Sequence, residues 1–160
     1  ERRAQCAAAA AFFGVPALRD VSVEAFKARA QELDAVKRRR ARHVITENAR
    51  TLRAVEVMRE GHADALGRLM DASHASLRDD FEVSSDELDE MVACAGREES
   101  CYGARMTGAG FGGSAVALVG EDEAEAFARA VAACYQRATG IAPDITICTA
   151  TAGAEVVVEE

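Results

Sequence analysis

The chain has 160 residues, of which 49% are hydrophobic and 29% charged, and its net charge at neutral pH is −8. This length suffices for one domain with a buried core, and the acidic balance disfavours nucleic-acid partners, because phosphate backbones attract clustered Lys and Arg. No apolar run reaches the roughly 20 residues of a membrane span, so we expect no membrane partner.

The first two-thirds of the chain has the residue spacing of helices. The opening "ERRAQCAAAAAFFGV" favours a helix and lacks an initiator Met, so we expect the chain to be a piece of a longer protein. A helical stretch to about Leu33 is followed by a long helix from about Ala35 to Glu60, with Gly61 as its C-terminal cap. Within it, "KRRRAR" predicts a solvated basic face. One buried face is predicted from the spacing of Ile45, Ala49, Leu52 and Val55.

The next helix ends near "RDDFEV" and is followed by another. The first of the two carries Leu66, Leu69, Met70, Ser73 and Leu77 on one side. Ser84 predicts a capping box at the start of the second, because Glu87 three residues on can return the hydrogen bond. We expect that helix to run to about Glu98.

From Cys101 the pattern changes to that of strands. "CYGARMT" and "SAVALVG" predict strands on either side of a glycine-rich loop, and "EDEAEAFARAVAACYQRATG" predicts an amphipathic helix that ends at Gly140. The apolar stripe of this helix is Phe127, Val131, Cys134 and Ala138. The alternation in "DITICTAT" predicts a half-buried strand, and "AEVVVEE" one more. Helices followed by a small sheet with a helix across it define an α+β domain over residues 1–160.

The five cysteines are widely spaced and include no CxxC pair. They are Cys6, Cys94, Cys101, Cys134 and Cys148. This pattern predicts neither a zinc site nor a disulfide framework, and a cytoplasmic, reducing location fits it best.

Several polar side chains are candidates for a site. His74 and Arg78 are four residues apart on one helix face, from which they either reach a cleft or make a packing contact. Arg105, just before the glycine loop, either counters phosphate charge or pairs with a neighbouring carboxylate. The acidic residues at 79, 80 and 82 lack a partner at metal-ligand spacing, so we expect no metal site there.

Four glycines fall within six positions of the loop, at Gly108, Gly110, Gly112 and Gly113. The letters match a dinucleotide fingerprint, but a strand-like segment follows where that site needs a helix. The absence of a terminal GK[ST] excludes a P-loop. The loop therefore joins two strands, and it either holds an anion on its backbone N–H groups or forms a tight turn that allows close packing.

"GARMTGAGFGG" resembles the third conserved motif of the GHMP small-molecule kinases, in the form typical of the galactokinases. "RRAQCAAAA", "ALRDV", "KRRRARHVITENART" and "SHASLRDDFEVSSDELD" resemble further segments of the same family in the same order. The resemblance covers nearly the whole chain. Gln5 and Ala7 depart from it, because acidic residues flank the cysteine in that family.

The resemblance implies a ferredoxin-like C-terminal domain, with a small antiparallel sheet packed against several helices. It also implies ATP-dependent phosphorylation of α-D-galactose with Mg²⁺. The catalytic residues and most of the ATP and Mg²⁺ site belong to an N-terminal lobe outside this chain, so we expect no catalytic or metal-binding residue here and no activity from the chain alone. The third motif lines the cleft with Thr107, Gly108, Ala109, Gly110, Phe111, Gly112 and Gly113.

Two other functions remain open at this point. One is a related GHMP kinase acting on N-acetylgalactosamine or another small alcohol. The other is a non-catalytic sugar sensor or interaction module on the same fold.

Overall fold

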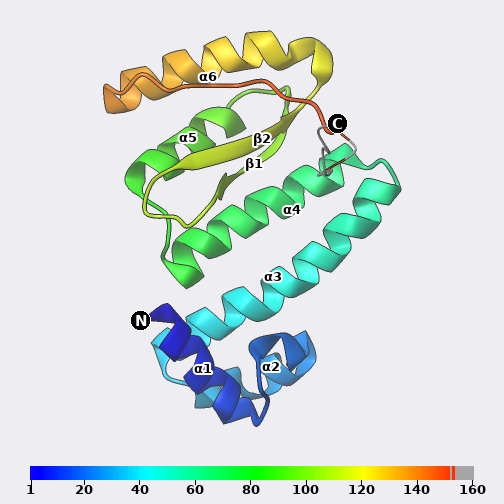
Figure 1. Cartoon of the computed structure of the whole chain (residues 1–160), viewed down its shortest axis with the longest axis vertical. Helices are drawn as coiled ribbons and strands as arrows, with labels where there is room; N and C mark the ends of the chain where they lie inside the picture. Colours follow the sequence, from blue (N-terminus) through cyan, green and yellow to red (C-terminus); the bar gives the residue numbers. More distant parts are fainter. Residues whose placement is uncertain (152, 154–160) are drawn as a thin grey trace, which may run out of the picture.

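The computed structural model describes residues 1–151 and 153, and the strand expected at 154–160 lies outside them. Helices come first, then a hairpin, then a last helix, which confirms the α+β class (Figure 1). The elements are α1 (Arg2–Phe13), η1 (Leu18–Asp20), α2 (Val23–Arg29), η2 (Ala30–Glu32), α3 (Ala35–Arg59), α4 (Ala63–Ser76), η3 (Leu77–Phe81), α5 (Asp86–Gly96), β1 (Cys101–Thr107), β2 (Ser114–Val119), η4 (Glu121–Glu123) and α6 (Ala124–Thr139).

Local signals set the ends of the long helix α3. The Asp34 side chain accepts a hydrogen bond from the Lys37 N–H at 2.9 Å, which satisfies one of the free amides of the first turn. At the other end Gly61 has a φ of 72°, and its N–H donates to the Met58 carbonyl at 3.2 Å. The predicted boundaries of this helix are confirmed.

The cap of α5 lies one residue later than predicted. Ser85, with extended backbone, accepts a hydrogen bond from the Leu88 N–H. The hydroxyl of Ser84 instead donates to the Asp89 carboxylate at 2.5 Å. The prediction of Ser84 as the cap is therefore wrong, because a contact further along the helix occupies its side chain.

The hairpin of β1 and β2 is antiparallel, with a register from Thr107 opposite Ser114 to Cys101 opposite Val119. Helices α5 and α6 pack together with it and form one of the cores. The buried members of that core are Cys94, Ala95, Ala104, Phe127, Val131 and Tyr135. The predicted stripe of α6 is wrong at Ala138, which is exposed, and it missed Tyr135, which is buried; Cys134 packs against the core as predicted.

A second core lies among α1, α2 and the first half of α3, at the other end of the molecule (Figure 1). It comprises Ala9, Ala10, Leu18, Val21, Phe26, Ala30, Leu33, Ala41 and Ile45. Helix α3 runs from this core toward α4, and the two helices pack together. The prediction of a buried face on α3 is wrong beyond Ile45. Leu52 is 70% exposed, and Ala49 and Val55 are also exposed.

Helix α4 covers the edge of β1 that does not pair with β2. The Ala104 N–H donates to the Asp71 carboxylate at 2.9 Å, and the Met106 N–H donates to Nδ1 of His74 at 3.3 Å. Side chains of a helix thus satisfy amides that an unpaired strand edge would leave free.

Two glycines allow this helix and strand to approach so closely. A Cβ added to Gly67 would lie 1.8 Å from the Tyr102 carbonyl oxygen, and one added to Gly103 would lie 2.1 Å from the Gly67 oxygen. No side chain fits at either position, so the backbones of α4 and β1 are in direct contact.

The segment 144–151, predicted as a strand, forms none in the structure. Ile145 packs against the core of α5, α6 and the hairpin, whereas Ile147 is 45% exposed. The alternation of the sequence is present, but among the described residues no neighbouring strand pairs with this segment.

Cys94 and Cys134 form a disulfide that links α5 to α6, with their Cα atoms 5.8 Å apart. The prediction that the cysteines stay unpaired is therefore wrong for these two. They are 40 residues apart in sequence, and only the packing of the two helices brings them together. None of the helices in the described part of the chain has the length and apolar character needed to cross a bilayer.

Replacing Gly67 with Ala should lower the free energy of unfolding by about 1–3 kcal/mol or more, because the added methyl group overlaps the backbone of β1. Gly96→Ala is the matched control, since a Cβ at this last residue of α5 meets nothing within 4 Å. The control should be neutral or gain up to about 1 kcal/mol. Urea unfolding of the two variants measures both values, and equal stabilities would contradict the close contact.

Candidate functional site: an exposed glycine loop

The glycine loop, residues 107–113, turns the chain from β1 into β2. Its glycines all have positive φ, at 84° for Gly108, 84° for Gly110, 123° for Gly112 and 108° for Gly113. Phe111 also has a positive φ, of 61°. Nearly the whole loop therefore has a backbone conformation that side chains disfavour, which accounts for its composition.

Most of the loop opens to solvent. Phe111 is 66% exposed, and a Cβ added to Gly108, Gly112 or Gly113 would meet nothing within 4 Å. Within the described residues, Phe111 is the one member of 108–113 whose amide donates to a protein acceptor. The other amides of this turn have no acceptor among the described residues, and successive N–H groups in turns are able to form an anion-binding concavity. The chemistry of this donor set suits phosphate.

Gly110 differs from the other glycines. A Cβ there would lie 2.2 Å from the Val83 carbonyl oxygen, and the same oxygen accepts the Phe111 N–H at 2.7 Å. The close-packing interpretation is therefore confirmed at Gly110, and anion binding by the rest of the loop stays a prediction. Gly110 allows close packing on the segment before α5, and the remaining glycines face outward.

Of the three polar candidates, His74 lies in the interior. It is 4% exposed, its Nδ1 accepts the Met106 N–H, and its Nε2 lies 3.2 Å from Asp89 without the angle of a hydrogen bond. Burial lowers the pKa of His74, and the Asp89 carboxylate opposes that shift. The neutral ring holds the edge of β1 just before the loop.

The two arginine candidates pair with carboxylates. Arg105 Nη1 lies 3.4 Å from the Glu47 carboxylate on α3, and Ser73 donates to the same oxygen at 2.5 Å. Arg78 is exposed and pairs with its neighbour Asp79 at 2.7 Å. Each of the three side chains thus has its own partner, and no hydrogen bond or ion pair of the described residues joins them to one another.

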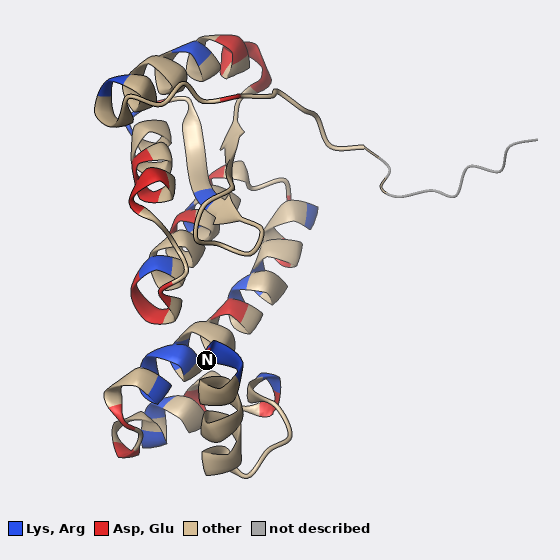
Figure 2. Cartoon of the chain, turned by 60° about the vertical axis from the view of Figure 1, so that its left-hand side comes forward, with Lys and Arg blue, Asp and Glu red and all other residues tan. Residues whose placement is uncertain are grey.

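The basic run of α3 is not the solvated face that the sequence predicts. Arg40 is 4% exposed, and its guanidinium contacts the Glu82 carboxylate and the Asp80 carbonyl. Arg42 pairs with the Asp80 carboxylate at 3.0 Å. Figure 2 shows basic residues at the start of α1 and in the first half of α3, which lie next to each other. The acidic segment before α5 supplies the partners of Arg39, Arg40 and Arg42, and no local pattern in the run of like charges indicates this.

His43, one turn further along α3, is also buried. Its Nδ1 lies 3.0 Å from the Ser76 hydroxyl, and its ring stacks on Phe81 with centroids 4.6 Å apart. Burial lowers the pKa of His43, against the opposing charge of Glu47. The contact fixes α3 against the end of α4.

Comparison with protein families matches residues 54–137 to the C-terminal domain of the GHMP kinases. This match covers more than half of the chain. The chain belongs to the GHMP kinase family. The matched region contains α4, α5, the hairpin and nearly all of α6, so the glycine loop is part of what defines the match.

Individual relatives give the same assignment. Galactokinases of Mannheimia succiniciproducens and Haemophilus influenzae are 48% and 47% identical to the chain over 95% and 98% of its length. The crystal structure of Lactococcus lactis galactokinase complexed with galactose has a TM-score of 0.84 and 39% identity over 88% of the chain. The chain spans only 40% and 42% of the two bacterial relatives and 38% of the solved structure.

Gly108 and Gly110 form a matched pair for mutation, because both have a φ of 84° and only Gly110 contacts Val83. Gly108→Ala should cost about 1–2 kcal/mol of unfolding free energy through backbone strain. Gly110→Ala should cost about 1–3 kcal/mol more, since its methyl group overlaps the Val83 carbonyl. Denaturant unfolding measures the difference, and equal costs would show that the contact is absent.

The two buried histidines should make stability fall as the pH becomes acidic. Their pKa values are lowered in the folded chain, whereas an unfolded histidine titrates near about 6.5, so the unfolded chain binds more protons below that pH. The unfolding free energy should be steady above about pH 7 and decrease from about pH 6.5 downward. Urea unfolding at several pH values measures this. The unfolding free energy of the double variant His43→Gln/His74→Gln should decrease less on acidification than that of the control His62→Gln. Equal dependence on pH in the two variants would show that the buried histidines do not cause the decrease.

Proposed function

We propose that this chain is the C-terminal lobe of a galactokinase, which transfers phosphate from ATP to the anomeric hydroxyl of α-D-galactose with Mg²⁺. One observation carries the proposal: the loop that resembles the third GHMP motif is exposed, and most of its backbone amides have no acceptor among the described residues. Galactokinases that are 47–48% identical over nearly the whole chain support the choice of substrate.

In this proposal the loop forms one wall of a cleft whose other wall is the N-terminal lobe. Glycines at 108, 112 and 113 leave room for a phosphate group, and their amides supply donors without a side chain. Phosphoryl transfer depends mainly on positioning and charge neutralisation, which suits a site shared by two lobes. Bound ATP with Mg²⁺ supplies the transferred group and most of the charge compensation. The chain itself contributes no catalytic base in this scheme.

The C-terminal half of α3 is the surface we propose for contact with the N-terminal lobe. Leu52, Val55 and Met58 recur every three residues there and are 70%, 36% and 54% exposed. An apolar stripe of this kind on a helix marks an interaction surface. The occupant we propose is the lobe that makes up the other three-fifths of the relatives' length.

We also propose that the protein works in the cytoplasm, where ATP is available. In that compartment thiol reductants would keep Cys94 and Cys134 as a pair of thiols. The packing of α5 on α6 does not depend on the disulfide alone, because Phe127 and Val131 are buried in the same core.

The chain alone should form no galactose 1-phosphate from galactose and Mg²⁺·ATP. Joined to the part of the Haemophilus influenzae galactokinase that it does not cover, it should phosphorylate galactose in a coupled ADP-release assay. Gly112→Val should lower kcat/KM at least about 100-fold by placing a side chain in the phosphate cradle. The control is Gly96→Val at the exposed last residue of α5.

Three outcomes would contradict the proposal. Turnover by the isolated chain would show a complete site within it. A folded fusion without turnover would favour a sensor or interaction module. A fusion that prefers N-acetylgalactosamine over galactose would assign the chain to another sugar kinase.

A further inference from the structure

The segment Phe81–Val83 connects the N-terminal helices to the glycine loop. Glu82 has a φ of 55°, in the left-handed region that disfavours residues other than glycine. This conformation ends η3 and turns the chain, so that the Val83 carbonyl accepts the Phe111 N–H at 2.7 Å. Such strained backbone persists only where surrounding contacts hold it.

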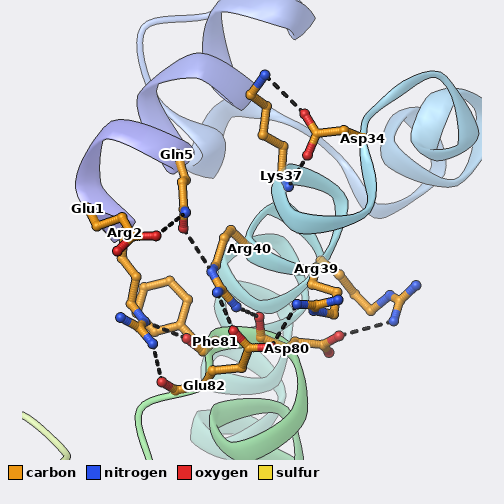
Figure 3. Close-up of polar contacts among 11 residues, drawn as sticks. Glu1, Arg2, Gln5, Asp34, Lys37, Arg39, Arg40, Asp80, Phe81 and Glu82 are labelled. Carbon is orange, nitrogen blue, oxygen red and sulfur yellow. Dashed lines mark hydrogen bonds and ion pairs between the residues drawn. The ribbon is translucent and has the colours of Figure 1, made fainter.

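Arginines from two helices hold this segment, and Figure 3 shows their contacts. We name Arg2, Arg39 and Arg40, together with Glu82, the arginine clamp. Arg39 and Arg40 both pair with the Glu82 carboxylate, and Arg2 donates to the Glu82 carbonyl and, at 2.6 Å, to the Phe81 carbonyl. The hydrogen bond from Arg40 lowers the pKa of Glu82, so the carboxylate stays charged at neutral pH.

Arg40 is the buried member of the clamp, and its partners come from two parts of the chain, α1 and the segment before α5. Its Nε donates to the Gln5 side chain at 3.0 Å and its Nη1 to the Asp80 carbonyl at 2.5 Å, while Nη2 contacts Glu82. A buried guanidinium is costly unless its donors are satisfied and its charge is paired. Glu82 supplies the charge, so the strained turn and the buried arginine depend on each other.

The clamp reaches the glycine loop in two ways, through the Val83 carbonyl next to Glu82 and through the Arg2 side chain. The Val83 carbonyl touches Gly110 closely enough to exclude a Cβ, and it accepts the Phe111 amide. The guanidinium of Arg2 also lies over the Phe111 ring, 5.1 Å from its centre. The position of the exposed loop therefore follows the position of Glu82 and Val83.

We propose that Arg2, Arg40 and Glu82 are positioning residues for phosphoryl transfer. They hold the Val83 carbonyl, and through it the glycine loop, in the shape in which its free amides meet a phosphate group. This inference rests on the proposed kinase function. The three side chains act through the Phe81–Val83 segment, and a misplaced loop lowers the rate because the transferred group must be aligned.

The first test measures amide hydrogen exchange in the 160-residue chain. Glu82→Gln should speed exchange of the Phe111 amide at least about tenfold, because the hydrogen bonds from Arg39 and Arg40 to this side chain lose their negatively charged acceptor. The core amide of Val131 should change less, which separates local loosening from global unfolding. Glu32→Gln, which removes an exposed ion pair with Arg29, is the matched control and should leave Phe111 unchanged.

A second variant covers the case in which Glu82→Gln does not fold. Glu82→Gly removes the carboxylate and also the backbone strain, so the chain should stay folded while the Phe111 amide still exchanges faster. Protection of Phe111 equal to that of the unchanged chain in this folded variant would overturn the proposal.

The kinase test uses the fusion with the Haemophilus influenzae N-terminal part. Glu82→Gly should lower kcat per folded molecule about tenfold, with KM for galactose changed by less than about twofold. An unchanged kcat with a loosened loop would overturn the positioning role. An inactive fusion carrying the unchanged chain would count against the proposed function, and hydrogen exchange alone would then decide whether the clamp holds the loop.

Discussion

The direct backbone contact between α4 and β1 is the constraint on which the rest of the structure depends. Because Gly67 and Gly103 have no side chains, the helix lies against the edge of the strand at a distance that no other residue pair allows. Asp71 and His74 then reach the amides of β1, and the strand is fixed along its free edge. The glycine loop begins where β1 ends, so the same contact fixes the position of its first residues.

The middle of the loop, at Gly110 and Phe111, is held by a segment that charged side chains position. The buried guanidinium of Arg40 requires the Glu82 carboxylate, and that pairing keeps a strained turn in place beside the loop. The two supports are of different kinds. The glycine contact at β1 is steric, with added hydrogen bonds to Asp71 and His74, whereas the clamp depends on charged groups from α1, α3 and the segment before α5. Between them the loop is fixed on its inner side and open on its outer side.

Elements determined by nearby residues were predictable. The boundaries of α3 follow from the cap at Asp34 and the left-handed Gly61, and the two strands follow from short apolar runs on either side of four glycines. Predictions failed where a contact outside the local pattern decides. Ser84 loses the capping role because its hydroxyl bonds to Asp89, and the alternating segment 144–151 has no neighbouring strand among the described residues. Ala49, Leu52 and Val55 of α3 follow the helical period and yet remain exposed, whereas Val57, outside the predicted face, is buried, because burial needs a partner as well as a pattern.

The sequence by itself determined the loop and its backbone, because positive φ is a local steric property and glycine is the residue that tolerates it. It also determined the family resemblance, which depends on residue types in order. Only the tertiary structure decided that Gly110 packs on Val83 while its neighbours face solvent, that Arg40 is buried, and that Cys94 meets Cys134. The contacts behind these features join residues that are 27 or more positions apart in the sequence, such as Val83 with Gly110 and Arg40 with Glu82. No local pattern records such a contact, since it exists only after the helices have packed.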